Sequence, residues 1–234
     1  MSYSYFREHL MKVKLISYSQ PSEEVLEEGL EDAQDLVAFC ARVSNPSNQM
    51  NTETSEKLIK YLIKHKHWSP MEMVSVCLEI ETTRDIGRQL LRHRSFSFQE
   101  FSQRYADPTK DLSFVVREAR LQDTKNRQNS IALDMTNDDQ RRIAYQWEQG
   151  QLNLTKQAQD LYTWAISKGI AKEQARAVLP EGLTMSRLYV NGTLRSWIHY
   201  IDVRADESTQ LEHRDIALEC AKVIAKVFPL ISDL

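Results

Sequence analysis

The stretch MVSVCLEIETTRDIGRQLLR, residues 73–92, decides the fold class, because it joins a strand pattern directly to a helix pattern. Over residues 74–80, apolar side chains alternate with more polar ones, which predicts a strand with one buried face. Thr83 then offers an N-cap and Asp85 an acid in the first turn, so we expect a helix over residues 83–92.

Further elements are expected on both sides of this stretch. They are a strand at 13–18 and helices at 30–43, 54–66, 139–167, 172–179, 193–203 and 208–228. Residues 183–190 fit either a strand or a helix, and the pattern does not decide between them. The polar segment 122–138 is expected to be a loop or a lid. Because strands and long helices alternate without a repeating strand–helix–strand rhythm, we expect an α+β fold in a single domain, residues 1–234.

The composition is that of an ordinary soluble globular protein, with 41% hydrophobic and 27% charged residues. Its longest apolar runs are too short to span a bilayer, so no membrane association is expected. A signal peptide is not expected either, because charges interrupt the N-terminal segment at Arg7, Glu8, Lys12 and Lys14. The six glycines are not spaced as a dinucleotide-binding or P-loop motif, which excludes both of those nucleotide sites at the motif level.

The three cysteines, Cys40, Cys77 and Cys220, form no Cys-x-x-Cys pair, and their odd number argues against a disulfide framework or a zinc ribbon. We therefore expect reduced thiols and a cytoplasmic location. Their places within the expected helices and strand predict raised thiol pKa values rather than a nucleophile. His65 and His67 form a His-x-His pair, but two ligands do not make a metal site, and none is predicted.

Arginine side chains gather in RQLLRHRSFSFQEFSQRY, residues 88–105, although the whole chain has a net charge of −3. On the expected helix, Arg84, Arg88 and Arg92 are spaced to lie on one face, where like charges destabilise a helix by roughly a few tenths of a kcal/mol per pair. Glu100 is the only carboxylate in the stretch, so no neighbour in the sequence neutralises the arginines. An anionic ligand is therefore expected, with a solvated basic face as the alternative.

Aromatic residues alternate with the polar residues of this stretch, at Phe96, Phe98, Phe101 and Tyr105. Part of the stretch should therefore pack against a core, where polar side chains need partners. A guanidinium donates two parallel hydrogen bonds to a phosphate, and hydroxyls and rings suit a heterocycle, so a nucleotide is the expected ligand. The negative net charge argues against a nucleic-acid surface, although a module for single-stranded nucleic acid is the alternative from another class.

The segment RHRSFSFQEFSQRY, residues 92–105, matches without a gap the RHRxxSxxxxSxRY signature of the flavin-dependent thymidylate synthases. Three further segments resemble parts of that family: HKHWSPMEM (65–73), QARAVLP (174–180) and TLRSWIHYIDVRAD (193–206). The resemblance implies a small, mostly antiparallel sheet packed against long helices. It also implies the reductive methylation of dUMP to dTMP.

According to this resemblance, FAD and dUMP would bind at the subunit interfaces of a homotetramer. FAD would be contacted by Ser69, Arg92, His93, Arg94, Glu100, Thr193, Leu194, Arg195 and His199. dUMP would be held by Gln89, Arg92, Glu100, Ser102, Gln103, Arg104, Arg176 and Arg204. Methylenetetrahydrofolate would supply the carbon, and NADPH would reduce the flavin. Thr193 and His199 depart from the Asn that is often found in the family.

The two catalytic candidates that the resemblance implies are Arg204 and Ser102. The Arg204 guanidinium would stabilise negative charge on the uracil ring, while the flavin supplies the hydride. Ser102 is either a nucleophile or a binding group. A serine needs a base to become reactive and no His–Asp pair is evident in the sequence, so we favour binding. A non-catalytic flavin or nucleotide sensor with the same fold is the remaining alternative.

Overall fold

The computed structural model describes residues 11–233 and has the expected α+β fold. Its main sheet is antiparallel, with four strands in the order β1-β2-β6-β3. These strands are β1 (Lys12–Tyr18), β2 (Ser75–Thr83), β6 (Met185–Thr193) and β3 (Ser97–Glu100). Arg7 and Glu8, on which the expectation about a signal peptide partly rests, lie outside the described residues.

Helices make up much of the remaining chain. The α-helices of residues 11–233 are α2 (Glu23–Glu27), α3 (Ala33–Ala41), α4 (Ser55–Lys64), α5 (Arg84–Leu90), α6 (Pro108–Asp111), α7 (Asp138–Ser167), α8 (Lys172–Ala175), α9 (Leu194–Arg204) and α10 (Leu211–Ile224). The short 3₁₀ helices of the same range are η1 (Pro46–Asn48), η2 (Ser69–Glu72), η3 (Arg176–Val178) and η4 (Pro229–Asp233). Within this described part, none of the helices combines the length and apolarity needed to cross a membrane.

Most of the expected elements are confirmed within a few residues. The expected helix 172–179 consists of α8 followed by the 3₁₀ helix η3. Most of the undecided segment 183–190 belongs to β6, which lies between β2 and β3 and contributes Leu188 and Val190 to the buried core. Helix α5 ends at Leu90 rather than at residue 92, because the chain must turn there for the next segment to return to the sheet. Helix α10 ends at Ile224 rather than 228, and Pro229 disfavours a helical conformation at residue 228.

The segment 122–138 is not entirely a loop, as had been expected. Its residues Ser130–Ala132 form β5, which pairs with β4 (Arg120–Gln122) in a separate two-stranded antiparallel sheet. The turn is held by Asp123, whose carboxylate accepts hydrogen bonds from the backbone N–H groups of Lys125 and Asn126. These hydrogen bonds lower the pKa of Asp123. The local polar sequence thus favours a hairpin turn, and the role of this segment as a lid stays a prediction.

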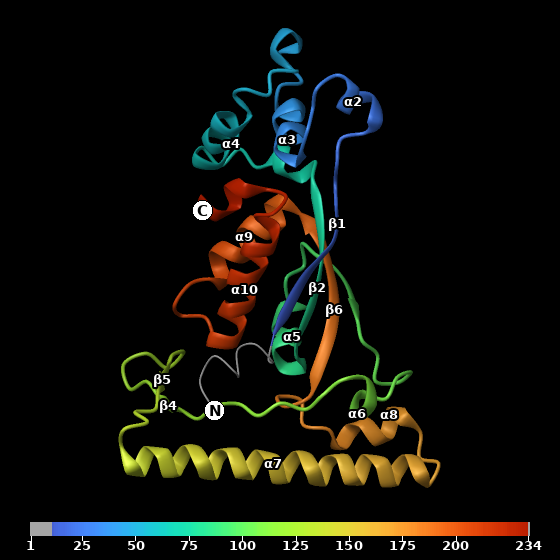
Figure 1. Cartoon of the computed structure of the whole chain (residues 1–234), viewed down its shortest axis with the longest axis vertical. Coiled ribbons are helices and arrows are strands. Elements are labelled where there is room, and N and C mark those ends of the chain that lie inside the picture. Colours follow the sequence, from blue (N-terminus) through green and yellow to red (C-terminus); the bar gives the residue numbers. More distant parts are fainter. Residues whose placement is uncertain (1–10, 234) are drawn as a thin grey trace.

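Helices α5, α9 and α10 contribute their apolar faces to the core that covers one face of the main sheet. Figure 1 shows α9 and α10 beside the sheet and α7 across the opposite end of the molecule from α3 and α4. The core is anchored by Trp197, which is fully buried and donates its indole N–H to the carbonyl oxygen of Val76 at 3.0 Å. On α7, Gln151 holds the chain around Arg117 by accepting from its backbone N–H and donating to its carbonyl oxygen, at 2.9 and 2.8 Å.

The two central strands each lead directly into a helix. β2 ends at Thr83, the N-cap of α5, and β6 ends at Thr193, the N-cap of α9. Ser75 lies opposite Thr193 and Thr83 lies opposite Met185, so the two helices begin at opposite ends of the strand pair. Because both helices pack into the same core, they run toward each other along one face of the sheet. This arrangement brings the residues that follow α5 close to the end of α9.

A glycine in β6 provides room for the segment between α5 and β3. A Cβ atom on Gly192 would lie 2.3 Å from Cδ1 of Phe96, so the ring packs directly on the Gly192 backbone. The Phe96 ring cannot easily move away, because its centroid lies 4.5 Å from that of Trp197 and 5.8 Å from that of Tyr200.

We expect Gly192→Ala to lower the free energy of unfolding by about 1–3 kcal/mol, because the added methyl group overpacks this site. Chemical denaturation of the single variant measures the loss. The double variant Gly192→Ala/Phe96→Leu is the control, because a smaller side chain at position 96 leaves room for the methyl group. Its loss should be smaller than the sum of the two single losses. Additive losses would show that the contact is not the cause.

Candidate active site

The convergence of α5 and α9 places a charged group against a neutral ring. Arg204, the last residue of α9, donates from Nε to Nε2 of His93 at 3.0 Å. Because a guanidinium has only donors, the accepting Nε2 carries no proton and the His93 ring is neutral. Burial, and then the charge of Arg204, lower the pKa of His93. Arg204 is thus held in one orientation.

Two further rings pack behind this pair. His213 and Tyr200 are almost fully buried, and their ring centroids lie 5.7 Å apart. Burial is the main cause that lowers the pKa of His213 to about 3, with contributions from the charges of Arg204 and His93. Burial also raises the pKa of Tyr200 well above its ordinary value. Both side chains are therefore neutral at physiological pH.

The arginines of α5 are paired with acids of the chain itself. Arg84 lies 3.3 Å from a carboxylate oxygen of Glu100, which also accepts from the Ser186 hydroxyl at 3.0 Å. Arg88 forms an ion pair with Glu181, a residue far along the chain. The expectation of an anionic ligand for the whole arginine face was therefore wrong for these two residues. Arg92 lies beyond the end of α5 and is exposed, as is Arg94.

The segment after β3 carries further expected nucleotide contacts. Ser102 is half-buried, and its hydroxyl accepts from the backbone N–H of Arg104 at 3.4 Å. Gln103 is buried, and its Nε2 has no hydrogen-bond partner within the described chain. Lys172 of α8 donates to the carbonyl oxygen of Tyr105 at 2.9 Å. This contact brings the segment beside α8 and η3, whose first residue is the half-buried Arg176.

The expected flavin contacts from η2 and α9 form a separate group. The ring centroids of Trp68 and His199 lie 4.7 Å apart, next to Ser69, the exposed first residue of η2. Arg195 forms an ion pair with Glu72 at the other end of η2.

Thr193 and Leu194 have structural roles at the start of α9. The Thr193 hydroxyl accepts from the backbone N–H of Ser196 at 3.3 Å, which caps the helix. Leu194 is fully buried in the core, and its backbone N–H donates to the carbonyl oxygen of Val74 at 2.8 Å. The structure therefore separates Leu194 from the exposed residues that were expected to share its site.

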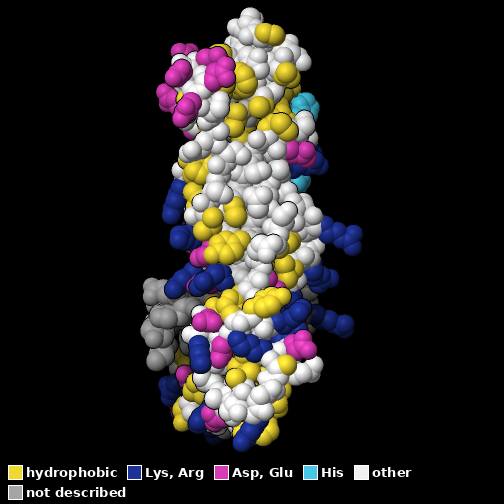
Figure 2. All heavy atoms as spheres, turned by 90° about the vertical axis from the view of Figure 1, so that its right-hand side faces the viewer, with side chains coloured by type: hydrophobic (Ala, Val, Ile, Leu, Met, Phe, Trp, Pro, Cys, Tyr) yellow, Lys and Arg dark blue, Asp and Glu magenta, His cyan; other side chains and the backbone are white. Residues whose placement is uncertain are grey.

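Positive charge is concentrated on part of the surface. In Figure 2, Lys and Arg side chains gather over the middle and lower part of the visible face, and acidic side chains form a cluster at its upper end. The net charge of −3 therefore conceals a basic region. This separation supports a locally assembled anion site.

Comparisons with known proteins show the family of the chain. A family model described as "Thymidylate synthase complementing protein" matches residues 25–230. The probable flavin-dependent thymidylate synthase of Paramecium bursaria Chlorella virus 1 is 47% identical over 222 residues, which cover 95% of this chain and 97% of the relative. The chain belongs to the flavin-dependent thymidylate synthases. The family member from Synechocystis sp. is also 47% identical, over 95% of this chain and 98% of its own.

A solved structure has the same fold as this family member. It is the UMP/dUMP methylase PolB from Streptomyces cacaoi bound with 5-Br UMP, which has a TM-score of 0.76 and 25% identity. The match covers 95% of this chain and 92% of PolB. The structure of the same enzyme bound with 5-Br dUMP also has a TM-score of 0.76, with 24% identity.

The three cysteines of this flavin-dependent thymidylate synthase behave as expected. Burial raises the thiol pKa of Cys40 and is also the main influence on the raised pKa of Cys77. Cys220 is fully buried, and burial raises its pKa further. A raised pKa disfavours the thiolate, which is the nucleophilic form of cysteine.

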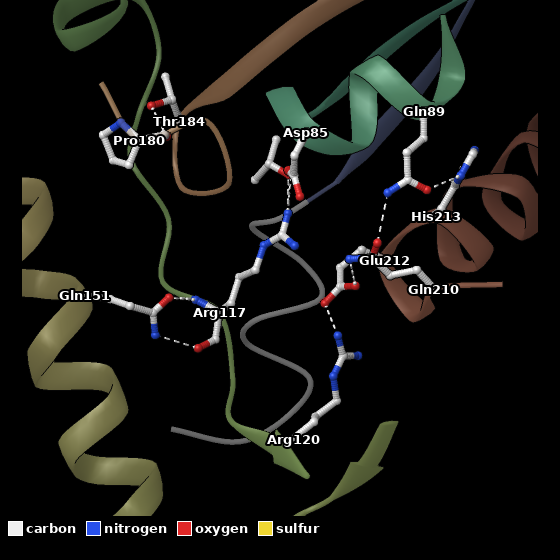
Figure 3. Close-up of polar contacts among 11 residues, drawn as sticks. Asp85, Gln89, Arg117, Arg120, Gln151, Pro180, Thr184, Gln210, Glu212 and His213 are labelled. Carbon is white, nitrogen blue, oxygen red and sulfur yellow. Dashed lines mark hydrogen bonds and ion pairs between the residues drawn. The ribbon is translucent and has the colours of Figure 1, made fainter. Parts of the chain in front are cut away.

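The sequence reasoning missed a group of polar residues at the start of α10. Gln210, Glu212 and His213 lie next to Gln89, and Figure 3 shows their side chains pointing toward one another. A signal was present, because His213 continues the buried stripe of α10 that includes Ile216. A polar residue on an apolar helix face needs a hydrogen-bond partner, so the position of His213 could have predicted a polar site here.

We expect the protein to become less stable as the pH decreases, partly because of His213. Its pKa of about 3 lies below the ordinary value of about 6.5. Between these two values the unfolded chain binds a proton that the folded chain does not, so acidification favours unfolding by at most about 1.4 kcal/mol per pH unit. Above about pH 6.5, His213 is neutral in both the folded and the unfolded chain and contributes no pH dependence.

Denaturation of the wild type and His213→Asn from pH 7 to pH 4 tests this expectation. The variant lacks the titrating ring and should show a shallower loss of stability as the pH falls. Identical slopes for both proteins would exclude His213 as a source of the pH dependence.

Proposed function

We propose that this protein catalyses the reductive methylation of dUMP to dTMP, with methylenetetrahydrofolate as the carbon donor and NADPH as the reductant through bound FAD. The observation that carries the proposal is the orientation of Arg204 by His93 of the signature segment, in a chain that belongs to this family. The name of PolB, a UMP/dUMP methylase, supports a uridine nucleotide as the substrate. We assign the activity to residues 1–234 as one domain and infer a cytoplasmic location from the three free cysteines.

The exposed residues around η2 and α9 fit an aromatic, anionic cofactor such as FAD. Trp68 and His199 offer two adjacent rings, and Ser69 offers a hydroxyl beside them. We propose that these rings, with the exposed Arg92 and Arg94, hold FAD. His93, Glu100, Thr193 and Arg195 are its further proposed contacts, whereas the burial of Leu194 favours a supporting role for that residue. When bound, the flavin supplies a hydride.

We propose that the nucleotide lies between the signature segment and η3. Arg104 and Arg176 come from neighbouring segments, and the guanidinium fork suits the phosphate. Ser102 serves as a binding group rather than a nucleophile, because the contact that its hydroxyl makes is with a backbone N–H and not with a base. Nε2 of the buried Gln103 lacks a hydrogen-bond partner within the described chain, which supports a place for this residue at the nucleotide. The remaining proposed contacts of dUMP are Gln89, Arg92, Glu100 and Arg204.

Arg204 is the proposed catalytic residue. Methyl transfer to carbon 5 of uracil requires an electron-rich ring, and the raised pKa values of the cysteines disfavour activation by a thiolate. A guanidinium that is already oriented stabilises negative charge on the ring without reorganisation. His93 fixes that orientation because it accepts from Arg204 Nε, which leaves the terminal nitrogens for the substrate.

A tritium-release assay with labelled dUMP, NADPH and methylenetetrahydrofolate tests the proposed function. We expect the purified protein to be yellow and to release tritium, and Arg204→Ala to lower turnover at least about 10²-fold while the flavin absorbance is kept. Arg187→Ala is the matched control, because Arg187 pairs with Glu81 on the sheet surface and should leave turnover intact. A yellow wild type without tritium release would favour the alternative of a flavin or nucleotide sensor.

We also propose that the protein is a homotetramer with its sites at subunit interfaces, and that α7 forms one contact between subunits. Spacings of four, seven and three residues place a set of large apolar side chains on one flank of α7. They are Ile143, Trp147, Leu154, Leu161 and Trp164, and each is between 45% and 53% exposed. An apolar seam with this period is typical of helices that pack against another helix. We infer that a second copy of the chain covers it.

We expect the double variant Leu154→Glu/Leu161→Glu to dissociate into smaller species, because the charges cannot be buried in a helix contact. Size-exclusion chromatography with light scattering measures the mass. Asn153→Glu, on the polar face of the same helix, is the control and should keep the wild-type mass. A leucine variant with unchanged mass would exclude α7 as a subunit contact.

A further inference from the structure

A connected set of polar side chains joins α5, α10 and β4 (Figure 3). Nδ1 of His213 lies 3.3 Å from Oε1 of Gln89, and Nε2 of Gln89 donates to Oε1 of Gln210 at 2.9 Å. Nε2 of Gln210 in turn donates to Glu212 at 3.0 Å. The other carboxylate oxygen of Glu212 accepts from the guanidinium of Arg120. Gln89 is thus held between a histidine and a glutamine.

The carboxylate at one end fixes the direction of every hydrogen bond in this set. The Glu212 carboxylate, paired with Arg120, only accepts, so Gln210 must present its amide NH₂ to it. The Gln210 carbonyl oxygen then faces Gln89, which must present its own NH₂. The Gln89 carbonyl oxygen consequently faces His213, whose Nδ1 must carry the proton. An amide that could otherwise turn by 180° has one orientation here.

The His213 ring is rigidly placed. It is fully buried, and its centroid lies 5.7 Å from that of Tyr200 and 6.2 Å from that of His93. Its Nε2 has no hydrogen-bond partner within residues 11–233. Within that range, the ring can therefore hold another side chain by a hydrogen bond through its contact with Gln89. The lowered pKa of His213, caused mainly by burial, keeps the ring neutral with a single N–H.

We propose that His213 is a positioning residue that fixes the amide of Gln89 and thereby selects uracil over cytosine. This inference rests on the proposed function, in which Gln89 contacts the nucleotide. The Gln89 amide uses one N–H toward Gln210 and one lone pair toward His213. Its second N–H and second lone pair can bind a ligand, and the positions of this donor and this acceptor cannot be exchanged.

The two pyrimidines present opposite patterns to such an amide. Uracil has an N–H donor at position 3 and a carbonyl acceptor at position 4. Cytosine has an acceptor at position 3 and an amino donor at position 4. An amide that can turn would pair with either base, whereas an amide fixed to match uracil leaves its donor and acceptor unpaired against cytosine. Unpaired buried polar groups are costly, and this cost produces the discrimination.

The test compares the binding of dUMP and dCMP to the flavin-loaded protein by isothermal titration calorimetry. We expect His213→Leu to weaken dUMP binding and to lower the preference for dUMP over dCMP by about tenfold or more. His213→Asn should retain most of the preference, because the Asn NH₂ replaces the Nδ1–H donor. Gln210→Leu removes the partner on the other side of Gln89 and should lower the preference in the same way.

The binding ratio separates this role from a structural one. A loss of stability alone would weaken the binding of both nucleotides and leave their ratio unchanged. An unchanged ratio in folded, flavin-bound His213→Leu or Gln210→Leu would overturn the positioning role while the proposed function stands. If the wild type itself binds no dUMP, both the proposed function and this inference fail.

Discussion

The hydrogen bond from Arg204 to His93 depends on the antiparallel pairing of β2 and β6. Each of these strands ends at a threonine in the N-cap position of a helix, and the antiparallel register places the two N-cap positions at opposite ends of the strand pair. The helices can bury their apolar sides only against the same face, so they run toward each other. Their ends meet as a guanidinium and an imidazole, 3.0 Å apart. The orientation of the proposed catalytic charge is thus a property of the whole sheet.

Charge is distributed so that some arginines are satisfied within the chain and others face outward. Arg84 and Arg88 are paired with Glu100 and Glu181, which reduces the repulsion along α5. Arg92 lies beyond the helix and is exposed. Arg84 and Arg88 contribute to the structure through these ion pairs, whereas Arg92 is in a position to attract an anion. A cluster of arginines in a sequence therefore overstates the positive charge that a ligand meets.

Much of the fold could be predicted because the local patterns agree with the tertiary structure. The alternation in β2 reflects burial on one face, and the threonine in the N-cap position of α5 reflects a direct strand-to-helix connection. The prediction was incomplete where local preference was weak. β3 is four residues long and pairs only with β6, and the hairpin of β4 and β5 lies in a polar segment. The partner of β3 is distant in the sequence, and the strands of the β4–β5 hairpin are three residues each, too short for a periodic pattern to identify them.

The sequence by itself determined the fold class, the places of the long helices, the raised thiol pKa values of the cysteines and, through its signature segment, the family. Only the tertiary structure decided which arginines are neutralised, because Glu181 and Arg88 are far apart along the chain. It also decided that His213 supports Gln89, and that Leu194 belongs to the core. The physical reason is that periodicity records which face of an element is buried, whereas hydrogen-bond partners depend on how separate elements pack.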